Sequence, residues 1–150
     1  MSVRRYAEGT TVAVETTQAE MRALLKKHGA THFMLGDVPG RQAVEFVLHG
    51  HRYRFAVDMP TAEWADGETA LSSWSKRYAD VISRKIESEW KRRWRARLLW
   101  LKATLEFSAG EGSDSLPYVL GAFAVLPDGR TLGQALSAGS IPLLGSGEDS

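Results

Sequence analysis

The chain carries the stretch AVEFVLHGHRYRFAV at residues 43–57, in which two runs with alternating apolar side chains flank His49-Gly50. A two-residue hairpin turn needs positive φ at both positions, which glycine adopts freely and histidine more readily than most residues. The stretch therefore predicts a β-hairpin in which Glu45 stands opposite Arg54 on a wet face. The other face is expected to lie in the core and carries Val44, Phe46, Leu48, His51, Tyr53 and Phe55.

Three further elements are predicted before the hairpin. Val12 and Val14 alternate with small or polar residues, which indicates a short strand. A capping-box spacing at 17–20 and the apolar stripe after it predict a helix over 18–28. Residues 31–35 are rich in β-branched and aromatic side chains and predict another strand.

A long helix dominates the second half of the chain. Residues 58–73 contain proline and glycine and are expected to form a long loop. No glycine or proline interrupts the segment from Ser75 to Phe107, which has the period of an amphipathic helix. Its apolar arc consists of Ile82, Ile86, Trp90, Trp94, Leu98, Leu101 and Leu105.

Shorter elements follow the long helix. A Gly/Ser-rich loop is predicted at 108–115 and a second helix at 116–125. The residues Pro127-Asp128-Gly129 favour a turn, after which Thr131 is suited to cap a short helix that ends at Leu136. We expect residues 137–150 to form a flexible C-terminal tail.

These elements predict an α+β fold in one domain over residues 1–136. A small antiparallel sheet of three or four strands would pack against one long amphipathic helix plus two or three short helices. The 150 residues include no cysteine, which excludes a disulfide framework, a cysteine zinc site and a thiol nucleophile. No apolar run is long enough for a membrane span and the first residues lack a signal-peptide pattern, so we expect a cytoplasmic protein with no membrane partner.

Basic residues concentrate between Lys76 and Lys102, where ten lysines and arginines meet only three acidic residues. This segment carries +7 and the rest of the chain −6, so the total of +1 conceals a strong local field. Five of these side chains lie within about 40° of one another on the predicted helix and span roughly 40 Å. This basic stripe consists of Arg77, Arg84, Lys91, Arg95 and Lys102.

The basic stripe is suited to contacts with nucleic acid, because lysine and arginine neutralise backbone phosphates. Arg52 and Arg54 on the wet face of the hairpin would extend it if the two surfaces adjoin. Trp74 and Trp100 lie at the margins of the apolar arc and are the candidates for stacking on bases. A solvated or oligomer-forming helix face is the alternative interpretation of the same charges.

No motif for catalysis, metal binding or a cofactor is present. The chain lacks a nucleophile elbow, a Walker loop and a dinucleotide-binding glycine motif. Its four histidines have no ligand spacing, so we expect no metal site and no enzyme. A metal-dependent nuclease that uses Asp58, Asp66 and Glu68 of the acidic loop at 58–68 is the weakest of the alternatives.

Several stretches resemble a family of small phage and prophage proteins of unassigned function. The likeness is carried by residues 91–106 and 125–133, and also by 6–10, 20–25 and the hairpin end Arg54-Phe55. The family pattern has Asn-Gly where this chain has His49-Gly50, and a more acidic segment where it has residues 115–118. The resemblance implies an origin in phage-encoded accessory genes, and no activity or functional residue can be carried over from it.

Two functions are compatible with these observations. The first is a non-enzymatic accessory protein that binds DNA or RNA in replication, recombination or annealing. The second is a protein-interaction module that inhibits a host protein such as a defence factor, with the Trp-rich helix or the acidic loop as its anchor. Under either, self-association is expected, because a helix of about 30 residues far exceeds the average length and its far end would pack on a second copy.

Overall fold

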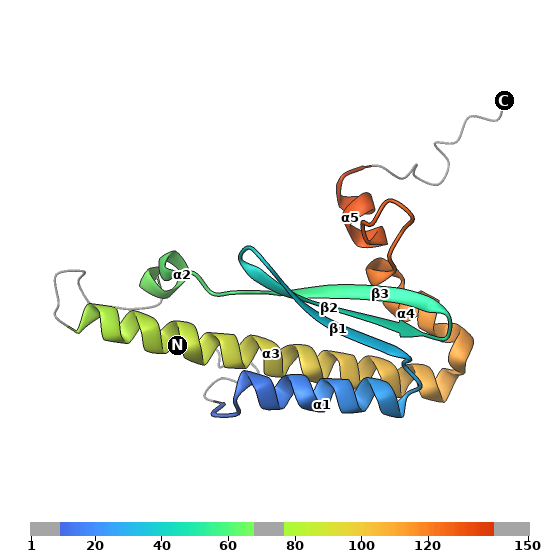
Figure 1. Cartoon of the computed structure of the whole chain (residues 1–150), viewed down its shortest axis with the longest axis horizontal. Helices are drawn as coiled ribbons and strands as arrows, with labels where there is room; N and C mark the ends of the chain where they lie inside the picture. Colours follow the sequence, from blue (N-terminus) through green and yellow to red (C-terminus); the bar gives the residue numbers. More distant parts are fainter. Residues whose placement is uncertain (1–9, 68–76, 140–150) are drawn as a thin grey trace.

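The computed structural model describes residues 10–67 and 77–139 and shows an α+β fold (Figure 1). Its sheet has three antiparallel strands in the order β1-β2-β3. They are β1 (His32–Val38), β2 (Arg41–Leu48) and β3 (His51–Asp58). Glu68, Trp74, the rest of the loop at 68–73 and the tail at 140–150 lie outside the described residues.

The hairpin forms as predicted. His49 and Gly50 have φ angles of 50° and 80°, as the two-residue turn requires. Glu45 pairs with Arg54 across β2 and β3. Of the residues expected in the core, only His51 is exposed, because it lies beside the turn at the end of the sheet.

Two of the helices in the described ranges lie along one face of the sheet, and the shorter ones lie around its ends (Figure 1). The helices are α1 (Val14–Lys27), α2 (Ala62–Gly67), α3 (Tyr78–Glu111), α4 (Leu116–Leu120) and α5 (Leu132–Ser137), with short 3-10 turns at Ser113–Ser115 and Gly121–Phe123. In Figure 1, α1 and α3 run side by side beneath the sheet. None of the helices in the described ranges combines the length and apolar composition needed to cross a membrane.

The core lies between the sheet and α3. Val44, Phe46, Leu48, Tyr53, Phe55 and Val57 of the sheet are buried there. Trp94 is completely buried at the centre of the arc on α3, and Met21 and Leu25 reach the same core from α1. The predicted arc is confirmed in its buried members Ile82, Trp94, Leu98, Leu101 and Leu105, while Ile86 and Trp90 are half-buried.

Two predictions near the N-terminus were wrong in their bounds or type. The strand expected at Val12 and Val14 is absent, because α1 already begins at Val14 and buries Val14, Thr17 and Met21 at helical spacing. The alternation of two valines was too short a signal to outweigh that period. Strand β1 continues beyond residue 35 to Val38, because backbone pairing with β2 extends to Arg41.

Three later boundaries also differ from the prediction. The segment predicted as a loop from Asp58 starts with the last residue of β3 and contains α2 close after it. α3 continues through the first half of the predicted Gly/Ser loop and ends at Glu111, and Gly112 caps it with a φ of 108°. The helix predicted over 116–125 ends early, because Ala124 forms an antiparallel bridge to Tyr53. The predicted cap at Thr131 is confirmed as a capping box with Gln134.

Candidate nucleic-acid interface

The basic stripe is interrupted by ion pairs in its middle. Lys91 lies 3.3 Å from Glu87 on the same helix, and Arg95 lies 2.7 Å from Glu20 on α1. Lys91 and Arg95 are both half-buried. Since α1 packs along α3 at this point, the centre of the stripe faces another helix of the same chain as well as solvent.

The ends of the stripe are exposed. Arg77 directly precedes α3, and Arg84 and Lys102 are exposed along it. Within the described part of the chain, neither Arg84 nor Lys102 has a carboxylate within 4 Å. Their positions are separated by about 27 Å at the rise of an α-helix. Arg84 and Lys102 are therefore two separate charges and do not form a continuous row.

The hairpin arginines do not adjoin the stripe. Arg52 and Arg54 project from the face of the sheet opposite the core, because their neighbours Tyr53 and Phe55 point inward. Both guanidinium groups lie within 4 Å of the Glu45 carboxylate, and Arg54 also donates to the Gly129 carbonyl. The sheet itself separates these charges from α3.

The predicted stacking residue Trp100 is half-buried and packs against two aromatic rings. Its ring centroid lies 5.5 Å from that of Phe55 and 5.0 Å from that of Phe123. The guanidinium of Arg97 lies 5.1 Å from the same ring. Trp100 also lines an open groove between α3 and β3. The neighbouring Trp94 is buried, so it cannot serve as a surface anchor.

A different basic site lies between α3 and β3, where an open groove of about 570 Å³ is present. We call it the arginine groove. Three of its lining residues are arginines of α3, namely Arg92, Arg93 and Arg97, and Asp58 and Ala56 line it from β3. These arginines belong to the basic segment between Lys76 and Lys102 but not to the basic stripe, and no role was predicted for them. Glu89, three and four residues before Arg92 and Arg93, was the signal that could have singled them out.

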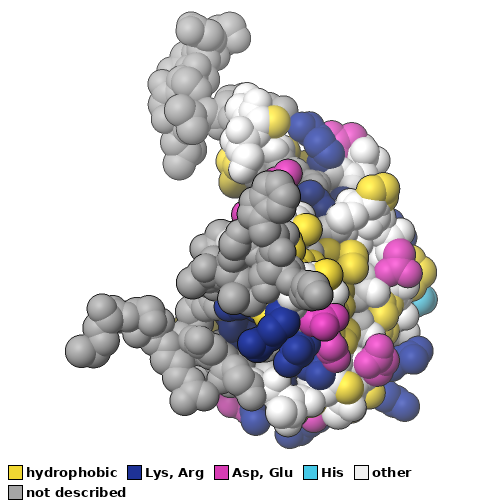
Figure 2. All heavy atoms as spheres, turned by 90° about the vertical axis from the view of Figure 1, so that its left-hand side faces the viewer, with side chains coloured by type: hydrophobic (Ala, Val, Ile, Leu, Met, Phe, Trp, Pro, Cys, Tyr) yellow, Lys and Arg dark blue, Asp and Glu magenta, His cyan; other side chains and the backbone are white. Residues whose placement is uncertain are grey.

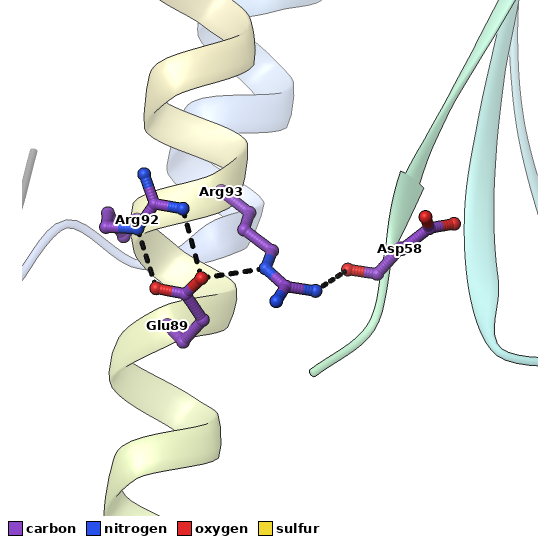
Figure 3. A network of polar contacts seen from close by, with 4 residues as sticks. All are labelled: Asp58, Glu89, Arg92 and Arg93. Carbon is purple, nitrogen blue, oxygen red and sulfur yellow. Dashed lines mark hydrogen bonds and ion pairs between the residues drawn. The ribbon is translucent and has the colours of Figure 1, made fainter. Parts of the chain in front are cut away.

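Glu89 holds two of these arginines in place (Figure 3). Its carboxylate is only 3% exposed and accepts hydrogen bonds from Arg92 Nε at 2.6 Å and Arg92 Nη2 at 3.0 Å. Arg93 Nε donates at 2.8 Å to Oε2, the oxygen that also accepts from Arg92 Nη2, while Arg93 Nη1 donates to the Asp58 carbonyl at 2.9 Å. Both guanidinium groups are thus oriented before any ligand arrives.

Arg97 is held by aromatic rings. Its guanidinium lies 5.3 Å from the Phe55 ring and 5.1 Å from the Trp100 ring, and it donates to the Ala56 carbonyl at 3.3 Å. Burial lowers the pKa of Arg97 from its ordinary value, and the charge of Asp58 opposes that shift. Arginine side chains are charged at neutral pH. No carboxylate of a described residue lies within 4 Å of the Arg97 guanidinium. An anion in the groove would meet a partly desolvated cation.

Acidic residues adjoin this basic region. Figure 2 shows lysine and arginine side chains gathered on one face of the molecule with carboxylates beside them. Asp58 lies 3.4 Å from Arg41, and Asp66 accepts a hydrogen bond from the Tyr78 hydroxyl. Among the residues that the structure describes, no three histidines or carboxylates come together in a metal-binding group.

The arrangement is suited to holding phosphate or carboxylate oxygens. Guanidinium groups bind such oxygens through paired hydrogen bonds, and those of the arginine groove are already oriented. Comparison with known proteins adds no assignment to this geometry: no protein-family model, no curated protein and no solved structure matches the chain.

Proposed function

We propose that this chain is a non-enzymatic nucleic-acid-binding protein that contacts backbone phosphates through the arginine groove. The observation that carries the proposal is the convergence of Arg92, Arg93 and Arg97 on one open groove. Two of the three are oriented by the buried Glu89, and the third is held over two aromatic rings. Arginines fixed in this way lose little side-chain freedom when they bind a phosphate.

Exposed charges elsewhere on α3 support the same function. Arg84 and Lys102 come before and after the groove arginines in the sequence of α3, on another face of the helix, and would attract a polyanion over a longer distance. The proposal thereby moves the predicted interface from the basic stripe, whose middle is paired with carboxylates, to the side of α3 that faces β3. An accessory role in phage DNA replication, recombination or annealing is the biological setting that we propose.

Fluorescence polarisation with labelled single- and double-stranded oligonucleotides at two salt concentrations tests the proposal. We expect binding whose affinity falls with salt by about 0.7 to 0.9 logarithmic units per phosphate contacted. Arg97→Gln should weaken binding by about tenfold and reduce the salt slope by about one phosphate. Arg97→Lys should lie between, since it retains the charge and loses the planar group.

Arg52→Gln is the matched control, because it removes the same charge from the opposite face of the sheet. It should change the affinity less than Arg97→Gln. Circular dichroism verifies that each variant is folded. Absence of binding at moderate salt, binding that salt does not weaken, or equal effects of the two substitutions would each argue against the arginine groove.

A further inference from the structure

The two edges of the sheet differ in how far the rest of the chain covers them. The edge of β3 is covered: the Val125 N–H donates to the Arg52 carbonyl at 2.9 Å, and Arg93 and Arg97 donate to the carbonyls of Asp58 and Ala56. The outer edge of β1 has no strand beside it among the described residues. An uncovered edge presents backbone N–H and C=O groups to any strand that can pair with them.

The sequence of β1 carries few of the residues that commonly prevent such pairing. Its seven residues, HFMLGDV, include no lysine, arginine or proline, the residues that commonly protect an edge. Met34, Leu35 and Val38 are 60%, 41% and 46% exposed. Beside them the sheet is hollowed by an open groove of about 410 Å³, because Gly36 and Ala43 have little or no side chain there. The edge is therefore apolar and accessible.

We propose that β1 pairs antiparallel with β1 of a second copy of this chain, with the two-fold axis at Leu35. Facing residues in such a pair must point to the same side of the sheet. Because side chains alternate along a strand, facing positions differ by an even number, and the two-fold axis therefore passes through a residue and not between two residues. With Leu35 on the axis, Phe33 faces the second copy's Asp37 and Met34 faces the second copy's Gly36. Side chains on both faces of β1 then gain neighbours.

Charge complementarity selects this register. The guanidinium of Arg22 lies 5.4 Å from the centre of the Phe33 ring. The second copy's Asp37 would face Phe33 and so lie beside Arg22, and the symmetry repeats this pairing. A shift of the axis by one residue to Met34 places the second copy's Leu35 opposite Phe33 and removes both ion pairs. The register centred on Leu35 is the one that pairs the charges nearest this edge.

The resulting dimer has one six-stranded sheet with both α3 helices on the same face. Its outermost strands are the two copies of β3, whose edges are already covered. At the usual strand spacing the two copies of β3 lie about 24 Å apart across the sheet. The surface differs from the far end of α3 that the sequence suggested, since α4 and Leu105 are packed at that end.

Sedimentation velocity of the full chain at tens of micromolar, after nuclease treatment, tests the proposal. The wild-type chain should sediment as a dimer and Leu35→Lys as a monomer, because it places two like charges on the axis. Leu136→Lys on α5 is the matched control, since Leu136 is also an exposed leucine, and it should stay dimeric. A monomeric wild type, or a Leu35→Lys variant that is still dimeric, would overturn the proposal.

Charge reversal tests the register independently of Leu35. Arg22→Glu and Asp37→Lys should each raise the dimer dissociation constant by about tenfold, and the double variant should recover most of that loss. Both positions are exposed, so neither substitution empties the core. A double variant that dimerises no better than either single variant would exclude the register centred on Leu35.

Discussion

The buried carboxylate of Glu89 accepts a hydrogen bond from Arg93 Nε at 2.8 Å, one turn further along α3. Arg92 donates two more bonds to the same group. Charge-assisted hydrogen bonds of this kind offset the cost of burying a carboxylate, provided that its partners stay in place. Because Arg93 also donates to the Asp58 carbonyl, the contact joins α3 to the edge of the sheet.

Replacing Glu89 tests the strength of this contact. Glu89→Gln keeps the shape but removes the charge that two arginines share, so the free energy of unfolding should fall by about 1–3 kcal/mol. Urea denaturation measures the loss. Glu87→Gln is the control on the same helix, because Glu87 makes an exposed pair with Lys91 and should change stability by less than about 1 kcal/mol. Equal losses would show that burial of Glu89 has no energetic consequence.

Burial of Tyr53 predicts a loss of stability at alkaline pH. Desolvation raises the pKa of the Tyr53 hydroxyl above its ordinary value of 10.0 in the folded chain. The folded state therefore holds this proton more tightly than the unfolded state, and the stability that results is lost as the pH rises through the raised pKa. Urea denaturation from neutral pH to above pH 10 should show a steeper fall for the wild type than for Tyr53→Phe. Parallel curves would contradict this.

The hairpin turn predicts that valine has different effects on stability at His49 and at His51. His49 has a positive φ of 50°, which a β-branched residue adopts only with strain. His49→Val should lower the free energy of unfolding by about 1–3 kcal/mol. His51→Val, at the start of β3, should be neutral or stabilising, because β-branched residues favour strands. Thermal or urea denaturation distinguishes the two, and similar effects would be inconsistent with the turn.

Replacing the buried Thr17 by valine should stabilise the folded chain. Its side chain is fully buried on α1, and its hydroxyl has no hydrogen-bond partner among the described residues. Thr17→Val keeps the shape and removes the unpaired polar atom, so the free energy of unfolding should rise by about 1 kcal/mol. Thr16→Val, on the adjacent exposed position, should have an effect within about 0.5 kcal/mol. A clear loss of stability in Thr17→Val would contradict the buried, unpaired hydroxyl.

Much of the fold could be predicted because it depends on neighbours in the chain. The positive φ values at His49-Gly50, the period of the α3 arc and the cap at Thr131 are all local features. The prediction failed where a short local signal competed with packing. Val12 and Val14 alternate as in a strand, but α1 gains burial of Val14 and Met21 against the core by starting early.

The candidate site could be predicted from the sequence less well than the fold, because it depends on contacts between segments that are distant in the chain. Arg95 meets Glu20 from 75 positions away, and Arg97 meets the Ala56 carbonyl from 41 positions away. Helical periodicity groups the charges of α3 by angle, but it does not say which group faces solvent, another helix or a strand edge. The basic stripe groups residues by their angle around the helix axis, whereas the arginine groove also depends on β3, which packs beside α3.

By itself, the amino-acid sequence determined the α+β class, the hairpin register and the buried arc of the long helix, since side-chain period and turn geometry act over a few residues. Only the tertiary structure decided which arginines are paired, which edge of the sheet is covered and where a groove opens. The physical reason is that charge pairing and solvent exposure depend on distance in space, and the chain sets that distance only when its separate segments pack together.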